Sequence, residues 1–174
     1  TRTRQMITRK YHANKYIAYF QNYTNTFLPP DRFRSYLMEA TRIPGVVEIS
    51  VSTRPDCVSA EYLDIMRDIR AMTGIQMNVE LGLQTVNYHT LMEMNRGHGL
   101  AEFIDAVLRI APYHFPVCVH MILNLPGDTM DDAEESARIL STLPISILYT
   151  FRSSANYMIS IFVEKSKFAQ KKNI

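Results

Sequence analysis

Ionisable and amide side chains recur at every second position of several short apolar segments, where acid–base chemistry or a polar ligand would require them. Because side chains alternate between the two faces of a strand, residues of equal parity share a face. One face of each segment is then mainly Ile, Val, Leu or Met, and the other carries a polar row. These rows are Tyr19, Gln21 and Tyr23; Glu48, Ser50, Ser52 and Arg54; Asn78, Glu80, Gly82 and Gln84; and Cys118, His120, Ile122 and Asn124.

The polar rows predict an open barrel whose interior holds a polar ligand or water. A closed eight-stranded barrel fills its interior with branched apolar side chains, and unpaired charges there would be costly. Two other interpretations remain open. Glu48, Glu80, Arg54 and His120 could form a structural ion network in a dry interior, or Glu80 and His120 could act as the acid and base of a metal-free barrel enzyme.

The elements that must position these rows alternate between strands and helices. Stripes at i, i+3, i+4 and i+7, such as Phe33–Ala40 and Ile104–Ala111, predict amphipathic helices between the strands. Strands that alternate with helices at this spacing indicate βα units and an α/β fold with a parallel sheet. The predicted strands are Tyr16–Phe20, Val46–Val51, Met77–Leu83, Val117–Leu125 and Ile145–Phe151.

Turn and cap residues mark where the helices begin and end. Pro29-Pro30-Asp31 should open the first long helix, and Ser59 can cap the next. Thr129 with Asp132 resembles a capping box. Gly97, after Asn95-Arg96, can end a helix.

The composition is that of an ordinary globular domain, because 47% of the 174 residues are hydrophobic and 21% are charged. The net charge of +2 is too small to indicate nucleic-acid binding by itself. No apolar run reaches the roughly 18 residues of a membrane span, and the basic start, Thr1–His12, does not match a signal peptide.

We expect a cytoplasmic protein in which Cys57 and Cys118 are reduced, buried thiols. His98 and His120 have no second ligand at helical or strand spacing, so no metal site is predicted.

Five segments at or just beyond the carboxyl ends of the strands form a specific series. They read YFQNYTNT from Tyr19, STRPD from Ser52, ELGLQ from Glu80, NRGH from Asn95 and LPGDT from Leu125. In this order the chain resembles, over about 9–144, the radical S-adenosylmethionine (SAM) proteins related to the Elongator catalytic subunit. The resemblance implies a partial, open, TIM-barrel-like (β/α)₆ barrel. It also implies a [4Fe-4S] iron–sulfur cluster and SAM, which is cleaved to a 5′-deoxyadenosyl radical.

The resemblance further implies a set of SAM contacts at the strand ends. Arg54 could pair with a carboxylate, and an adenine needs an apolar shelf with backbone partners. The implied contacts are Gln21, Asn25 and Thr26 at the methionine end; Ser52 and Arg54; Glu80 and Gln84 near the ribose and carboxylate; and Leu125, Pro126 and Gly127 beside the adenine.

The sequence departs from this family at both ends. The CxxxCxxC motif that ligates the cluster does not occur, and Cys57 and Cys118 cannot replace three converging thiolates. We therefore expect a chain that begins after the family's first strand and cluster loop and does not bind the cluster. Residues 152–174 hold neither Gly nor Pro and end in a basic run, which predicts a divergent tail after a barrel core at 1–151. Asn124 stands where relatives usually carry Gly.

The leading hypothesis is the core of a radical SAM enzyme that modifies RNA, specifically tRNA, with a flavodoxin or ferredoxin as its reductant. The tRNA substrate is implied by the resemblance to the Elongator-related branch. Basic residues such as Arg9, Lys10 and Lys15 are either phosphate contacts or a solvated helix face. The alternative is a non-catalytic fragment or degenerate homologue that binds a partner through open edge strands.

Overall fold

The protein folds around one curled, mainly parallel sheet. The computed structural model describes residues 2–22, 24–152 and 159–164. The sheet has the order β1-β2-β3-β4-β5-β6, with β1 to β5 parallel and β6 antiparallel to β5. The strands are β1 (Tyr16–Phe20), β2 (Val46–Thr53), β3 (Gln76–Gln84), β4 (Val117–Leu123), β5 (Ile147–Arg152) and β6 (Ile159–Glu164). The five predicted parallel strands are therefore confirmed, each within two residues at either end.

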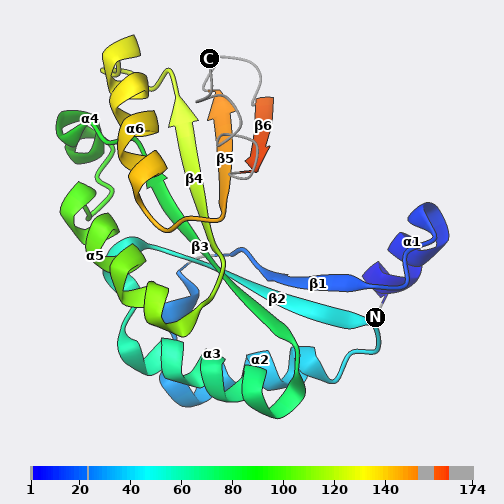
Figure 1. Cartoon of the computed structure of the whole chain (residues 1–174). Helices are drawn as coiled ribbons and strands as arrows, with labels where there is room; N and C mark the ends of the chain where they lie inside the picture. The colour runs from blue at the N-terminus through cyan, green and yellow to red at the C-terminus, as the bar shows by residue number, and fades with distance from the viewer. Residues whose placement is uncertain (1, 23, 153–158, 165–174) are drawn as a thin grey trace, which may run out of the picture.

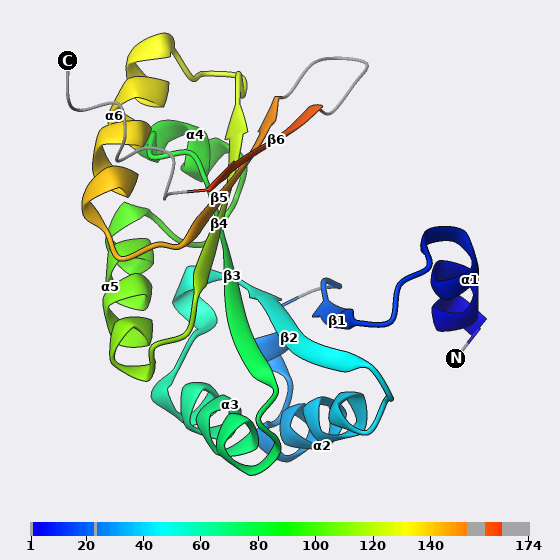
Figure 2. The same ribbon diagram turned by 45° about the vertical axis from the view of Figure 1, so that its right-hand side comes forward.

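Helices cover one side of this sheet. Figures 1 and 2 both show α2 to α6 along the convex side, whereas the concave side is open and α1 stands away from the helical layer. The helices are α1 (Arg2–Tyr11), α2 (Pro30–Thr41), α3 (Ala60–Thr73), α4 (Tyr88–Glu93), α5 (Leu100–Ile110) and α6 (Met130–Thr142), with short 3₁₀ turns η1 (Asn25–Phe27), η2 (Pro55–Cys57) and η3 (Ala111–Tyr113). The expected open, partial barrel of the α/β class is confirmed. No described helix is both long and apolar enough to cross a membrane.

Local sequence explains the helix boundaries. Pro30 opens α2, where its missing N–H costs nothing. The predicted capping box of α6 forms, because Thr129 Oγ1 accepts from the Asp132 backbone N–H and the Asp132 carboxylate accepts from Thr129 N–H. Ser59 occupies the N-cap position of α3 without a side-chain cap bond. Gly97 follows α4 in the left-handed region, with φ +72°.

Alternate residues of the strands face opposite sides, as the sequence pattern predicts. The outward rows are buried among the helices: Ile49 and Val51 of β2, Leu81 of β3 and Val119 of β4 have no exposed surface. They join helix residues such as Phe103 in one apolar core. Burying each such side chain contributes about 1.5 to 3 kcal/mol. The opposite row of each strand is left for the concave side.

The predicted division at residue 151 falls close to the end of β5. Beyond it, the structure describes the antiparallel strand β6. The rest of the expected basic tail lies outside the described residues.

Candidate functional site

The concave face of the sheet holds a cavity of about 950 Å³. This volume falls in the range of ligand sites, roughly 300 to 1,000 Å³. All five parallel strands contribute inward side chains, among them Tyr19, Ser52, Glu80, His120 and Tyr149. Members of all four polar rows found in the sequence therefore line one cavity, whereas Arg54 and Asn124 lie outside its lining and Tyr23 lies outside the described residues.

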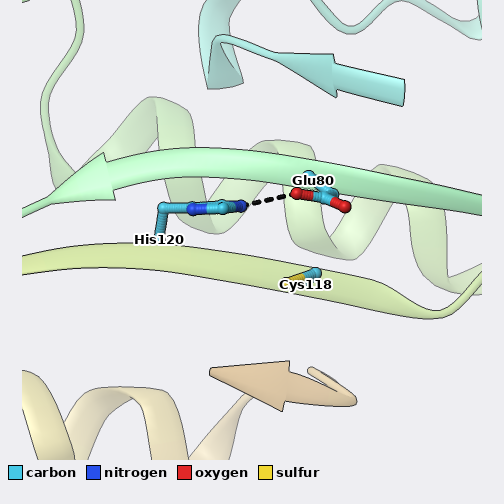
Figure 3. Close-up of side chains that lie close together, drawn as sticks. All are labelled: Glu80, Cys118 and His120. Atoms are coloured by element: carbon cyan, nitrogen blue, oxygen red, sulfur yellow. Dashed lines mark hydrogen bonds and ion pairs between the residues drawn. The ribbon is translucent and has the colours of Figure 1, made fainter. Parts of the chain in front are cut away.

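Glu80 lies at the centre of a hydrogen-bond network on the cavity wall. Its Oε1 accepts from Ser50 Oγ, and its Oε2 accepts from the Tyr19 hydroxyl at 2.9 Å. Figure 3 shows the contact of the same carboxylate with His120, where Oε2 lies 2.6 Å from Nε2. Burial raises the pKa of Glu80, but the hydrogen bonds from His120, Ser50 and Tyr19 outweigh burial and lower it overall. Burial and the Glu80 charge in turn raise the pKa of Tyr19, which stays protonated and donates. Glu80 is therefore an ionised carboxylate at neutral pH.

The four members of the possible ion network in a dry interior do not form one hydrogen-bonded network but have separate partners. Glu80 pairs with His120, whereas Glu48 accepts from Asn78 Nδ2 at 2.5 Å. Arg54 is held by Asp56 through both Nε and Nη2, at 3.0 and 2.6 Å. Because these pairs line or flank a cavity of ligand size, the dry-interior interpretation does not describe this face.

Arg96 is the cation that the sequence analysis missed. It follows α4, and its side chain reaches the cavity, where Nη2 lies 3.5 Å from the Gly82 carbonyl oxygen. Its Nε is buried without a hydrogen-bond partner among the described residues. Burial, and secondarily the Arg54 charge, lowers the pKa of Arg96. A half-buried guanidinium with an unused donor is suited to an anionic ligand group.

Gly82 provides the space that Arg96 and Gln84 occupy. A Cβ at Gly82 would lie 2.6 Å from Gln84 Nε2 and 3.2 Å from Arg96 Nη2. The β3–β4 register shifts between Gly82 and Gln84, and Gln84 has φ +74°. This bulge directs the Gln84 amide into the cavity, as bulges near functional sites commonly do.

The structure places the ten residues of the sequence-based SAM set in two groups. Four line the cavity: Gln21, Ser52, Glu80 and Gln84. The other six, Asn25, Thr26, Arg54, Leu125, Pro126 and Gly127, are not part of the cavity lining.

Residues of η1 connect the ends of two strands. Asn25 is buried, and its Nδ2 donates to the carbonyl oxygens of Phe20 and Ser52 at 2.7 and 2.8 Å. The Thr26 hydroxyl is 2.5 Å from that of Thr53. These contacts fix the carboxyl ends of β1 and β2, and so position the cavity rim.

The loop after β4 packs against the start of α4. The Gly127 carbonyl oxygen accepts from Asn87 Nδ2 at 3.4 Å, and Gly127 has φ +91°. Asn124, directly after the end of β4, has φ +63°. Among residues with a side chain, Asn adopts this region at low cost, so the expected turn is kept.

The two cysteines occupy different environments. Cys57 is half-buried in η2, and Cys118 is buried in β4 on the cavity wall. Burial, with a smaller effect of the Glu80 charge, raises the pKa of the Cys118 thiol. Cys57 does not line the cavity.

Comparisons with known proteins identify the cavity-bearing region. The family model described as "Radical SAM superfamily" matches residues 5–140. YtqA of Bacillus subtilis is 35% identical over 136 residues, which cover 78% of this chain and 42% of YtqA. The threonylcarbamoyladenosine tRNA methylthiotransferase MtaB of Chlamydia pneumoniae is 26% identical over 124 residues, 70% of this chain and 29% of MtaB. The chain spans about two fifths of the length of relatives such as YtqA.

Solved structures share the fold. Elp3 of Methanocaldococcus infernus, with an N-terminal deletion, superposes with a TM-score of 0.72 at 19% identity, covering 87% of this chain and 40% of that one. Coproporphyrinogen III oxidase (HemN) of Escherichia coli, a radical SAM enzyme, superposes with a TM-score of 0.62 at 20% identity, covering 75% of this chain and 30% of that one.

Proposed function

Because the chain belongs to the radical SAM superfamily, we propose that its cavity binds SAM and that the chain is the SAM-binding core of a tRNA-modifying enzyme. The observation that carries the proposal is Arg96, a half-buried cation on the wall of a ligand-sized cavity, whose Nε has no hydrogen-bond partner among the described residues. The methionyl carboxylate of SAM is an anion of the size that a guanidinium binds through two parallel hydrogen bonds.

The remaining polar groups match the rest of the ligand. Gln21, Ser52 and Gln84 supply amide and hydroxyl groups that can accept from an ammonium and donate to or accept from a ribose. Phe151 and Ile122, near the carboxyl ends of β5 and β4, add an apolar surface to the same lining. These side chains would bind and orient SAM and exclude water from it. SAM itself supplies, when it is reductively cleaved, the 5′-deoxyadenosyl radical that defines the family.

The other cofactor of the family does not fit the residues of this sequence. A [4Fe-4S] cluster of this type needs three converging thiolates, and the sequence contains two cysteines. Only Cys118 lines the cavity. We therefore infer that the 174-residue chain alone binds SAM without cleaving it.

The tRNA substrate is proposed from two supports. MtaB is by name a tRNA methylthiotransferase and shares sequence with most of this chain. The last turn of α1 carries Arg9 and Lys10, and such cations can contact phosphates. A tRNA substrate would place the enzyme in the cytoplasm, with a flavodoxin or ferredoxin as the expected electron donor.

A comparison of SAM with its parts tests the proposal. Isothermal titration of the 174-residue chain should give one SAM site, weaker binding of S-adenosylmethionine methyl ester, and weakest binding of adenosine. The ester removes the anionic charge and adds only one methyl group, so its loss of affinity reports mainly the contact with Arg96. Equal affinity for SAM and its ester would contradict this orientation. Absence of SAM binding by the folded chain would favour the non-catalytic alternative.

A further inference from the structure

Three side chains of different donor type converge on the cavity wall. The Glu80 carboxylate, Cys118 Sγ and a His120 ring nitrogen all lie within 4.8 Å of one another. Figure 3 shows Glu80 on β3 and the other two on β4. Strand geometry explains the convergence: Glu80 and Cys118 are paired positions of adjacent strands, and Cys118 and His120, two residues apart, share the inward face.

We propose that Glu80, Cys118 and His120 bind one divalent transition-metal ion, with zinc as the ion that suits this donor set. Zinc accepts thiolate, imidazole and carboxylate ligands together, whereas magnesium and calcium prefer oxygen alone. Three protein ligands leave a fourth position, which here opens toward the cavity. Open sites of this kind bind water or substrate.

The existing hydrogen bond marks where the ion would enter. His120 Nε2 and Glu80 Oε2 are 2.6 Å apart, a hydrogen-bond distance. Two tetrahedral zinc ligands of these types lie about 3.3 Å apart, so a small separation of the side chains admits the ion. The imidazole proton then resides on Nδ1, and the Cys118 thiol releases its proton to solvent as the sulfur–metal bond forms.

The surroundings already orient the ligands. Ser50 and Tyr19 donate hydrogen bonds to the Glu80 carboxylate, which is the outer-shell support that metal-bound carboxylates usually have. The His120 ring stacks on Phe151, with centroids 5.8 Å apart and an interplanar angle of 7°. Because the thiol is protonated in the metal-free chain, metal affinity should rise with pH.

This site goes beyond the proposed SAM function and can be tested without SAM. Its three ligands are separate from Arg96 and from Gln84 at the end of β3. It is also distinct from the iron–sulfur cluster, because it uses a single thiolate. Metal binding without SAM binding would overturn the proposed SAM function and leave the metal site. SAM binding without metal binding would overturn the metal site and leave the SAM function.

Cobalt(II), a spectroscopic substitute for zinc, provides the test. We expect the 174-residue chain to take up one equivalent, with visible d–d bands and a near-ultraviolet thiolate-to-cobalt charge-transfer band. Cys118→Ser should lose the charge-transfer band, whereas Cys57→Ser, the matched control, should keep it. Failure of the wild type to bind cobalt stoichiometrically, or loss of the band in Cys57→Ser alone, would refute the site.

A second variant covers the case in which Cys118→Ser does not fold. His120→Gln keeps a polar side chain beside Glu80 and should weaken zinc binding at least about tenfold, the usual effect of losing a ligand or its support. Zinc should also raise the melting temperature of the wild type but not of His120→Gln. Equal zinc-dependent shifts in both proteins would contradict the assignment.

Discussion

The two faces of strands β2, β3 and β4 differ in composition although their residues alternate along the same segments. The outward face is apolar and buried beneath the helices, as Leu81 and Val119 illustrate. The inward face carries Glu80 and His120 on the wall of a cavity. The comparison teaches that one face supplies stability and the other lines the cavity that we propose as a ligand site, so neighbouring substitutions should have different consequences.

The largest expected effect lies on the outward face. Leu81→Ala removes a side chain with no exposed surface, and the resulting cavity should lower the free energy of unfolding by about 2 to 5 kcal/mol. Leu108→Ala on α5, where the side chain is 55% exposed, is the matched control and should cost under about 0.5 kcal/mol. Urea denaturation measures both. Similar costs for the two variants would contradict the assignment of the core.

The next largest effect lies on the inward face and concerns binding. Arg96→Gln should weaken SAM binding by roughly 10- to 100-fold, because the ligand carboxylate loses its charged partner. Its stability should be almost unchanged, since the guanidinium makes no ion pair among the described residues. Arg138→Gln on exposed α6 controls for the loss of a charge. Isothermal titration would contradict the prediction if both variants bound SAM equally.

The contribution of Glu80, on the inward face, to the stability of the fold should depend on pH. Its folded pKa is lowered, so its contribution to stability is present above the ordinary value of 4.5 and is lost as the pH falls through the folded pKa. Glu80→Gln should therefore cost on the order of 1 kcal/mol at neutral pH, and this difference should shrink below pH 4.5. Denaturation curves across pH measure it. A difference that grows toward acid would show that Glu80 is protonated in the native state.

A pair of glycines gives the smallest predicted effects. Gly74→Ala, at φ +71° in open space, should cost about 1 kcal/mol of stability through backbone strain alone. Gly82→Ala should change stability by less than about 0.5 kcal/mol, but its Cβ displaces Gln84 and Arg96, so SAM affinity should fall severalfold. Thermal melts and titrations of both variants compare the two effects. Unchanged SAM affinity in Gly82→Ala would separate Gly82 from the site.

Much of the fold could be predicted because strand and helix periods are local. Parity correctly assigned Ile49 outward and Glu80 inward, and five strands were found from apolar runs. The cavity position of Arg96 could not be predicted, because NRGH was interpreted as a helix end and a long side chain reaches beyond its own segment. Left-handed Asn95 and Gly97 on either side of Arg96 fix that loop, and this geometry is not visible in the sequence.

Some site predictions depended on contacts between distant segments. Arg54 has the right residue type for a carboxylate, but Asp56 occupies its guanidinium. The sequence suggested that Glu80 and His120 could meet across strands, but Cys118 was interpreted only as a buried thiol, so its pairing with Glu80 in the register between β3 and β4 was missed. Strand parity gives the face on which a residue lies, and only the register between strands shows which residues meet.

A crystal structure of the chain with SAM tests the central claim most directly. We expect SAM on the concave face, with its carboxylate within hydrogen-bond distance of Arg96 and its polar groups among Gln21, Ser52 and Gln84. SAM bound elsewhere, or Arg96 turned away from a ligand in the cavity, would contradict the assignment of the inward face as the cofactor site.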